Sequence, residues 1–79
     1  MTVDPDAPTP LYYQVADVLR AQIADGTMTG RVPSAATIAQ QYEVAKGTAE
    51  RALGILREEG LIRSVIGRGH FVVPAAERG

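Results

Sequence analysis

The spacing of apolar residues changes once along this chain, at Gly60, and this change constrains the fold more than any other feature. Before Gly60, apolar residues recur at intervals of three and four, as they do on one face of a helix. After it, residues 61–65 and 70–73 are short runs rich in β-branched and aromatic side chains, which are typical of strands. The sequence therefore predicts helices first and a pair of strands last.

A first helix is predicted between Pro10 and Gly26. Thr9 suits its N-cap, and Pro10 suits the first helical position, where the missing N–H costs nothing. Gly26 is a typical residue for the end of a helix. The apolar stripe of this helix consists of Leu11, Val15, Leu19 and Ile23.

Two further helices are separated by only about three residues, 43–45. The second has Ser34 as its N-cap and runs for about two to three turns. The third is predicted over residues 46–59, and Gly60 stands at its expected end. Two helices joined so closely are typical of a helix-turn-helix. The core stripe of the third helix consists of Ala49, Ala52, Leu53 and Leu56.

The two strands follow the third helix directly, around a turn at residues 66–69, so they form a hairpin that must lie beside that helix. Residues 31–32 could add a very short third strand, and Leu61 and Phe71 are expected in the core. The predicted fold class is mainly α with a small β-hairpin. It is a winged helix-turn-helix of three helices and a two- to three-stranded wing.

Three segments are expected. Residues 1–8, with two aspartates and two prolines, are predicted to be a flexible N-terminal arm. Residues 9–73 form the winged helix-turn-helix domain, and residues 74–79 form a frayed C-terminal tail. With 79 residues, the chain has room for one small domain only.

Composition argues against several classes of protein. The chain has no cysteine and a single histidine, and it offers no phosphate-binding glycine loop, so neither an enzyme nor a metal or cofactor site is expected. No apolar run approaches the roughly 20 residues of a membrane helix. The net charge is −1, but residues 31–73 carry six basic against four acidic residues, which is a mild basic bias.

Six short motifs follow one another along the chain, at residues 10–15, 33–34, 47–48, 51–53, 57–62 and 67–72. In their order and spacing they resemble the DNA-binding domain of GntR-type bacterial transcriptional regulators. The resemblance covers residues 9–73 and implies a cytoplasmic repressor, associated with the nucleoid when bound, that binds an inverted-repeat operator as a homodimer. Members usually carry a C-terminal effector domain, for which this chain has no room, so it is expected to be a short member or an excised domain.

The sequence departs from the family pattern on its helices. Ala35 and Ala36 stand where the family usually has an acidic residue and an arginine, and Ala45 stands where a serine or threonine usually caps the third helix. Lys46 replaces a usual arginine and loses its bidentate fork. Glu50 stands where a basic residue is common, and its carboxylate repels phosphate, although it could accept from cytosine N4.

Candidate DNA-binding residues fall on the third helix and on the wing. Recognition helices read bases with their N-terminal residues, so the third helix is expected in the major groove. Arg68 could enter the minor groove, where the potential is most negative, and its flanking glycines permit positive φ and close approach. Ser34 could present the start of the second helix to a phosphate. The candidates are Ser34, Lys46, Gly47, Thr48, Arg51, Gly67, Arg68, Gly69 and His70.

Each candidate also has an ordinary structural interpretation. Charged helix residues usually form a solvated face, a hairpin turn needs glycine whatever its function, and a lone histidine is more often a strand residue than a ligand. A second hypothesis therefore stays open, in which the chain is a winged-helix protein–protein interaction module with weak or lost DNA binding. Glu50 and the negative net charge favour it.

Overall fold

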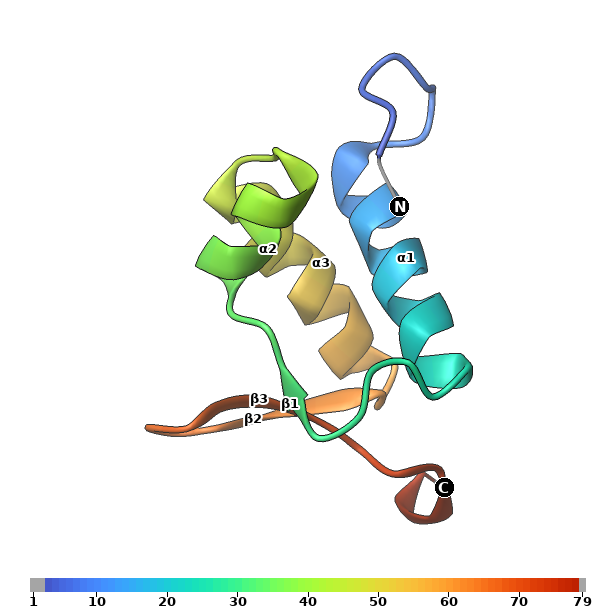
Figure 1. Ribbon diagram of the computed structural model, residues 1–79, viewed down its shortest axis with the longest axis vertical. Coiled ribbons are helices and arrows are strands. Elements are labelled where there is room, and N and C mark those ends of the chain that lie inside the picture. Colours follow the sequence, from blue (N-terminus) through green and yellow to red (C-terminus); the bar gives the residue numbers. More distant parts are fainter. Residues whose placement is uncertain (1–2, 79) are drawn as a thin grey trace.

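The computed structural model describes residues 3–78, which form three helices followed by a small antiparallel sheet (Figure 1). Helix α3 lies between α1 and α2, and the sheet lies across the end of the helical layer, beneath the last turn of α3. This is the predicted winged helix-turn-helix. Its elements are α1 (Leu11–Ala24), β1 (Arg31–Val32), α2 (Ala35–Tyr42), α3 (Lys46–Glu58), β2 (Ile62–Val65), β3 (Gly69–Val72) and a short 3₁₀ helix, η1 (Ala75–Glu77).

One apolar core joins all three helices to the sheet. The predicted stripe of α3 is buried in full, and on α1 the stripe is buried from Val15 onward, while Leu11 is half-buried. Burying a side chain the size of leucine stabilises a fold by roughly 1.5–3 kcal/mol, so this core supplies most of the favourable free energy of folding. Its largest fully buried side chains are Val15, Leu19, Ile38, Leu56 and Ile62.

Helix α1 begins one residue later than the sequence suggested. Pro10, with φ −56° and ψ 146°, occupies the N-cap position, so the prediction of Thr9 as N-cap was wrong. The Thr9 carbonyl instead accepts from Gln14 Nε2 at 2.8 Å. The Pro10 ring fixes φ near −65° but leaves ψ free to be helical or extended. Proline therefore fits the N-cap position as well as the first turn of a helix.

Part of the predicted N-terminal arm contacts α1. The Asp4 N–H donates to Gln14 Oε1 at 2.6 Å, and Gln14 Nε2 donates to the Asp4 carbonyl at 2.8 Å. Val3 packs against the core. Met1 and Thr2 lie outside the described residues, and the flexibility of the arm stays a prediction.

The helix-turn-helix forms from two differently capped helices. Ser34 caps α2 as predicted, since its Oγ accepts from the Thr37 N–H at 3.2 Å. Glu43 ends α2 in the left-handed region, at φ 54°, which turns the chain toward α3. Ala45 is the N-cap of α3 and has no side-chain acceptor to offer. The second helix is therefore anchored at its start, whereas the third is not.

The sheet has the strand order β1-β3-β2, with both pairs antiparallel, so the third short strand is present. Successive strand residues face opposite sides, so the register defines two rows. Val32, His70 and Ser64 form the row facing the helices, while Arg31, Phe71 and Arg63 form the outer row. The expectation that Phe71 belongs to the core was wrong, because it is half-buried on the outer face.

The ends of the wing differ slightly from the prediction. Gly69 belongs to β3 rather than to the turn, which is limited to residues 66–68. Within the predicted tail, residues 75–77 form η1, and Glu77 lies 3.8 Å from Arg63 of β2 as an ion pair. Gly79 lies outside the described residues. None of the helices formed by residues 3–78 is long and apolar enough to span a membrane.

Candidate nucleic-acid interface

The first turn of α3 presents three of the predicted residues together. Lys46 and Gly47 are exposed and Thr48 is half-buried, and these are the first three residues of α3, whose backbone N–H groups lack an intrahelical acceptor. The first helical bond is that of the Ala49 N–H to the Ala45 carbonyl. Unpaired N–H groups, the positive end of the helix dipole and the Lys46 ammonium make this turn attractive to an anion.

Arg51 is held against α1. Its guanidinium carbon lies 4.1 Å from the centre of the Tyr12 ring, a distance typical of a cation–π contact. Tyr12 in turn contacts Tyr13, with ring centres 4.9 Å apart. One face of the guanidinium is therefore covered by an aromatic ring, while the residue as a whole stays exposed. Only the packing of α1 against α3 brings Arg51 and Tyr12 together.

The rest of the exposed surface of α3 is of mixed charge. A shallow depression between α1 and α3 brings Glu50 and Glu58 beside Arg51 and Arg57. Arg57 donates to Ser64 Oγ of β2 over 3.4 Å, which is a weak bond. Negative charge on this surface opposes contact with phosphate.

Glu59, at the end of α3, is paired with α1 rather than with Arg57. Arg20 donates to both of its carboxylate oxygens, from Nε at 2.8 Å and from Nη2 at 2.7 Å, and it also bonds Asp17. The hydrogen bond to Glu59 is the main cause that raises the pKa of Arg20, and the same bond lowers the pKa of Glu59. This pair fixes the end of α3 from which the wing begins.

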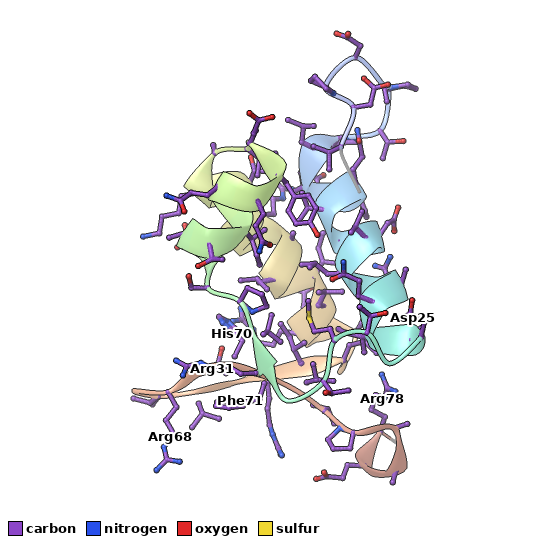
Figure 2. All side chains as sticks on the ribbon, viewed as in Figure 1. Asp25, Arg31, Arg68, His70, Phe71 and Arg78 are labelled. Atoms are coloured by element: carbon purple, nitrogen blue, oxygen red, sulfur yellow. The ribbon has the colours of Figure 1, made fainter. Side chains whose placement is uncertain are left out.

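The wing tip is a tight turn. The Arg68 N–H donates to the Val65 carbonyl at 3.0 Å, and Gly67 at the third position has φ 78°, the feature of a type II turn. Gly69 has φ 101°. Both positions disfavour any residue with a Cβ, so the backbone conformation alone accounts for these two glycines, one in the turn and one at the start of β3. Arg68 is exposed and points away from the helices (Figure 2).

The wing and the start of α2 share one cleft. Its lining includes Ser34 from the start of α2, Arg31 of β1, and Gly69 and half-buried His70 of β3. The Arg31 guanidinium runs along β3, so a Cβ at Gly69 would lie 3.7 Å from its Nη2. Arg31 was not among the predicted site residues, because only the pairing of β1 with β3 brings it there.

Charge is distributed unevenly over these groups. Within residues 3–78, ion pairs involve Arg20 and Arg63, whereas the other cations have no carboxylate within 4.0 Å; these are Arg31, Lys46, Arg51, Arg57, Arg68 and Arg78. Cations without an internal partner keep their full charge available to an external anion. Arg31 and Arg68 lie on a strand and on the turn of the wing, Lys46, Arg51 and Arg57 lie on α3, and Arg78 follows η1. No group of three metal-ligating side chains occurs in this part of the chain.

Solved structures share this arrangement. AraR(DBD) in complex with operator ORX1 is 29% identical with a TM-score of 0.83, and the match covers 92% of this chain and 95% of that one. YtrA from Sulfolobus acidocaldarius, a GntR-family transcription factor, is 31% identical with a TM-score of 0.82, over 91% of this chain and 78% of that one. The fold is therefore that of winged-helix DNA-binding domains.

Sequence comparisons agree. The HTH-type transcriptional repressor NagR of Bacillus subtilis is 35% identical over 74 residues, 91% of this chain and 30% of NagR. The mannosyl-D-glycerate transport/metabolism system repressor MngR of Escherichia coli is 34% identical over 80% of this chain and 27% of its own length. This chain thus spans less than a third of either relative. Residues 11–72 match the family described as bacterial regulatory proteins, gntR family. The chain belongs to this family of transcription regulators, which are not enzymes, and it forms the family's winged helix-turn-helix domain.

Proposed function

We propose that this chain is a sequence-specific, duplex-DNA-binding transcriptional repressor, with the recognition helix, residues 46–59, in the major groove and the wing, residues 66–70, in the minor groove. The observation that carries the proposal is that Arg31, Lys46 and Arg68, which have no ion pair within residues 3–78, are presented by three elements that one small sheet and core hold together. Contacts of cations with phosphate dominate the affinity of proteins for DNA.

The helix contributes base contacts. Lys46 and Thr48, on the first turn of α3, are the side chains nearest its positive end, and Gly47 between them has open space where a Cβ would stand. A helix without a side chain at that point can approach the groove closely. Arg51, stacked on Tyr12, presents its remaining donors from a restrained guanidinium, which lowers the entropy lost on contact.

The wing and the start of α2 contribute backbone and minor-groove contacts. Arg68 enters the minor groove, while Gly67 and Gly69 let the chain approach the sugar–phosphate backbone. His70 and Ser34 border the cleft that also contains Arg31, where a phosphate oxygen would meet the start of α2.

The wider biology of the family completes the proposal. NagR and MngR are repressors, and AraR(DBD) forms a complex with an operator, so repression from an operator is proposed here as well. One domain of this size makes few contacts, so it acts as a homodimer on an inverted repeat, with half-sites about one helical turn apart. The site of action is the cytoplasm, at the nucleoid.

The test is a binding titration against a fluorescent random-sequence duplex across a range of salt concentrations. The wild-type chain is expected to bind at low salt, and Arg68→Ala is expected to reduce the slope of log K against log salt by about 0.9. Arg78→Ala is the matched control, because it removes the same charge near the C-terminus, at the opposite end of the sheet from the wing tip (Figure 2). Its slope should equal that of the wild type.

The second candidate function, a protein–protein interaction module, has one observation in its favour. Glu50 and Glu58 place two carboxylates on the exposed surface of the very helix that should meet phosphates. Absence of any binding to duplex at low salt would contradict DNA recognition and support this module, since the non-specific electrostatic contribution appears first.

A further inference from the structure

Ile66 stands at the apex of the wing with its side chain entirely in solvent. Its exposure is 101% of the reference area, against 46% for Tyr13 and 37% for Val65, the other large apolar residues exposed within residues 3–78. It occupies the second position of the tight turn, between Val65 and Gly67. An isoleucine at this point gives up all of its apolar surface to water.

The turn itself does not require isoleucine. The second position of a type II turn has φ near −60° and accepts most residues, with proline preferred. The side chain packs against nothing in the fold, in contrast to the glycines on its C-terminal side, which the backbone demands. The fold therefore gives no reason for an apolar residue here.

The neighbourhood of Ile66 indicates what could cover it. Arg68, two residues on, has no carboxylate within 4.0 Å among residues 3–78 and extends from the same turn. Proteins that bind the minor groove frequently combine basic side chains such as arginine with an apolar wedge (Phe, Leu, Ile, Met or Pro) that partly unstacks a base step. Arg68 and Ile66 place a cation and an exposed apolar side chain on the same turn, which is the combination that such proteins use.

We propose that Ile66 is a specificity-determining residue that enters the minor groove beside Arg68 and selects a deformable base step. This inference rests on the proposed function. Pyrimidine–purine steps, TA and CA/TG, unstack most easily, so the wing would choose sequence through deformability rather than through hydrogen bonds to base edges. The apolar contact would also add affinity that does not depend on salt, unlike that of Arg68.

Selection from a random duplex library tests the proposal directly. The wild-type chain and Ile66→Ala are each used to enrich duplexes, and the two enriched sets are compared position by position. The wild type is expected to enrich TA or CA/TG steps at the positions facing the wing. Ile66→Ala is expected to lose that enrichment while keeping the preferences read by α3, and Ile66→Leu, which keeps an apolar side chain, should retain both.

A titration on the duplex most enriched by the wild type gives a second readout. Ile66→Ala should weaken binding about tenfold, which corresponds to about 1.4 kcal/mol, with an unchanged salt slope. Its melting temperature should equal that of the wild type, because Ile66 packs against nothing in the fold.

The outcomes separate this inference from the proposed function. Enrichment of no sequence by the wild type would overturn DNA recognition itself. Enrichment by the wild type, with Ile66→Ala giving the same sequences and the same affinity, would overturn the role of Ile66 and leave DNA recognition in place. A loss of affinity accompanied by a lower salt slope would also overturn it, because the contact would then be electrostatic.

Discussion

The first turn of α3 and the wing tip both belong to the proposed interface, but the fold restricts their side chains to different degrees. α3 has one face committed to the core and a half-polar opposite face, where Lys46 is followed by Glu50 and Arg51 is stacked on a tyrosine. No side chain of the wing tip packs in the core, and the conformation of the tip depends only on two glycines and one backbone hydrogen bond. Its exposed side chains, Ile66 and Arg68, are therefore free of folding constraints. From this comparison we propose that the wing would supply the larger share of the affinity for DNA and α3 the smaller.

The largest expected effect comes from removing the negative charge on α3. Glu50→Lys replaces a carboxylate that repels phosphate by an ammonium, so binding to random-sequence duplex at low salt should strengthen about tenfold. The control is Asp25→Lys, the same charge change near the end of α1, away from the wing tip (Figure 2). Titrations of both variants measure the effect, and equal affinities for the two would show that α3 does not face the duplex.

A smaller effect concerns the two helix starts. Ser34→Ala removes the side-chain acceptor of the Thr37 N–H and should lower the free energy of unfolding by about 1 kcal/mol. Ala45→Ser supplies an acceptor to α3, where the backbone already has the extended conformation of an N-cap, and should raise it by a similar amount. Thermal melts should therefore move in opposite directions, each by about 4–8 °C. A lower melting temperature for Ala45→Ser would contradict the capping argument.

The smallest expected effect concerns the ion pair between Arg20 and Glu59 at the end of α3, where the wing begins. Arg20→Met breaks the pair with Glu59 and should lower the melting temperature at pH 7 by about 2–4 °C, the range for an exposed pair worth about 0.5 kcal/mol. Because the folded state lowers the pKa of Glu59, the contribution is present above the ordinary glutamate pKa of about 4.3 and is lost as the pH falls through the lowered value. Melts at pH 7 and in acid, with Arg78→Met as the control, measure this. A difference between wild type and Arg20→Met that persists in acid would rule out the ion pair as its cause.

Local signals made most of the fold predictable from the sequence. The apolar stripe of α3, the Ser34 cap and the position of the hairpin depend on residues close together along the chain, and each was confirmed. The error at Thr9 was local as well, because proline suits both the cap and the first turn. The error at Phe71 concerned which face of the sheet its side chain occupies. A hydrophobic run without clear alternation of apolar and polar residues does not specify that face.

The long-range parts of the site were beyond the sequence. Arg31 reaches the wing only because β1 pairs with β3, which places Arg31 opposite Phe71, forty residues later in the sequence. Arg51 reaches Tyr12 only because α1 packs on α3. Ile66 was visible as a residue of the turn, but its complete exposure followed only from the geometry. The roles proposed for the predicted site residues remain for experiment.

Strand β1 is only two residues long, yet it ends immediately before the Pro33–Ser34 start of α2 and is bonded to β3 of the wing. The backbone therefore links the helix-turn-helix directly to the wing. In the proposed complex, this link would restrict how far the two parts could move to fit the grooves that they contact. One base pair inserted between those grooves would displace one part along and around the duplex, so the spacing within each half-site would be as strict a requirement as the bases themselves.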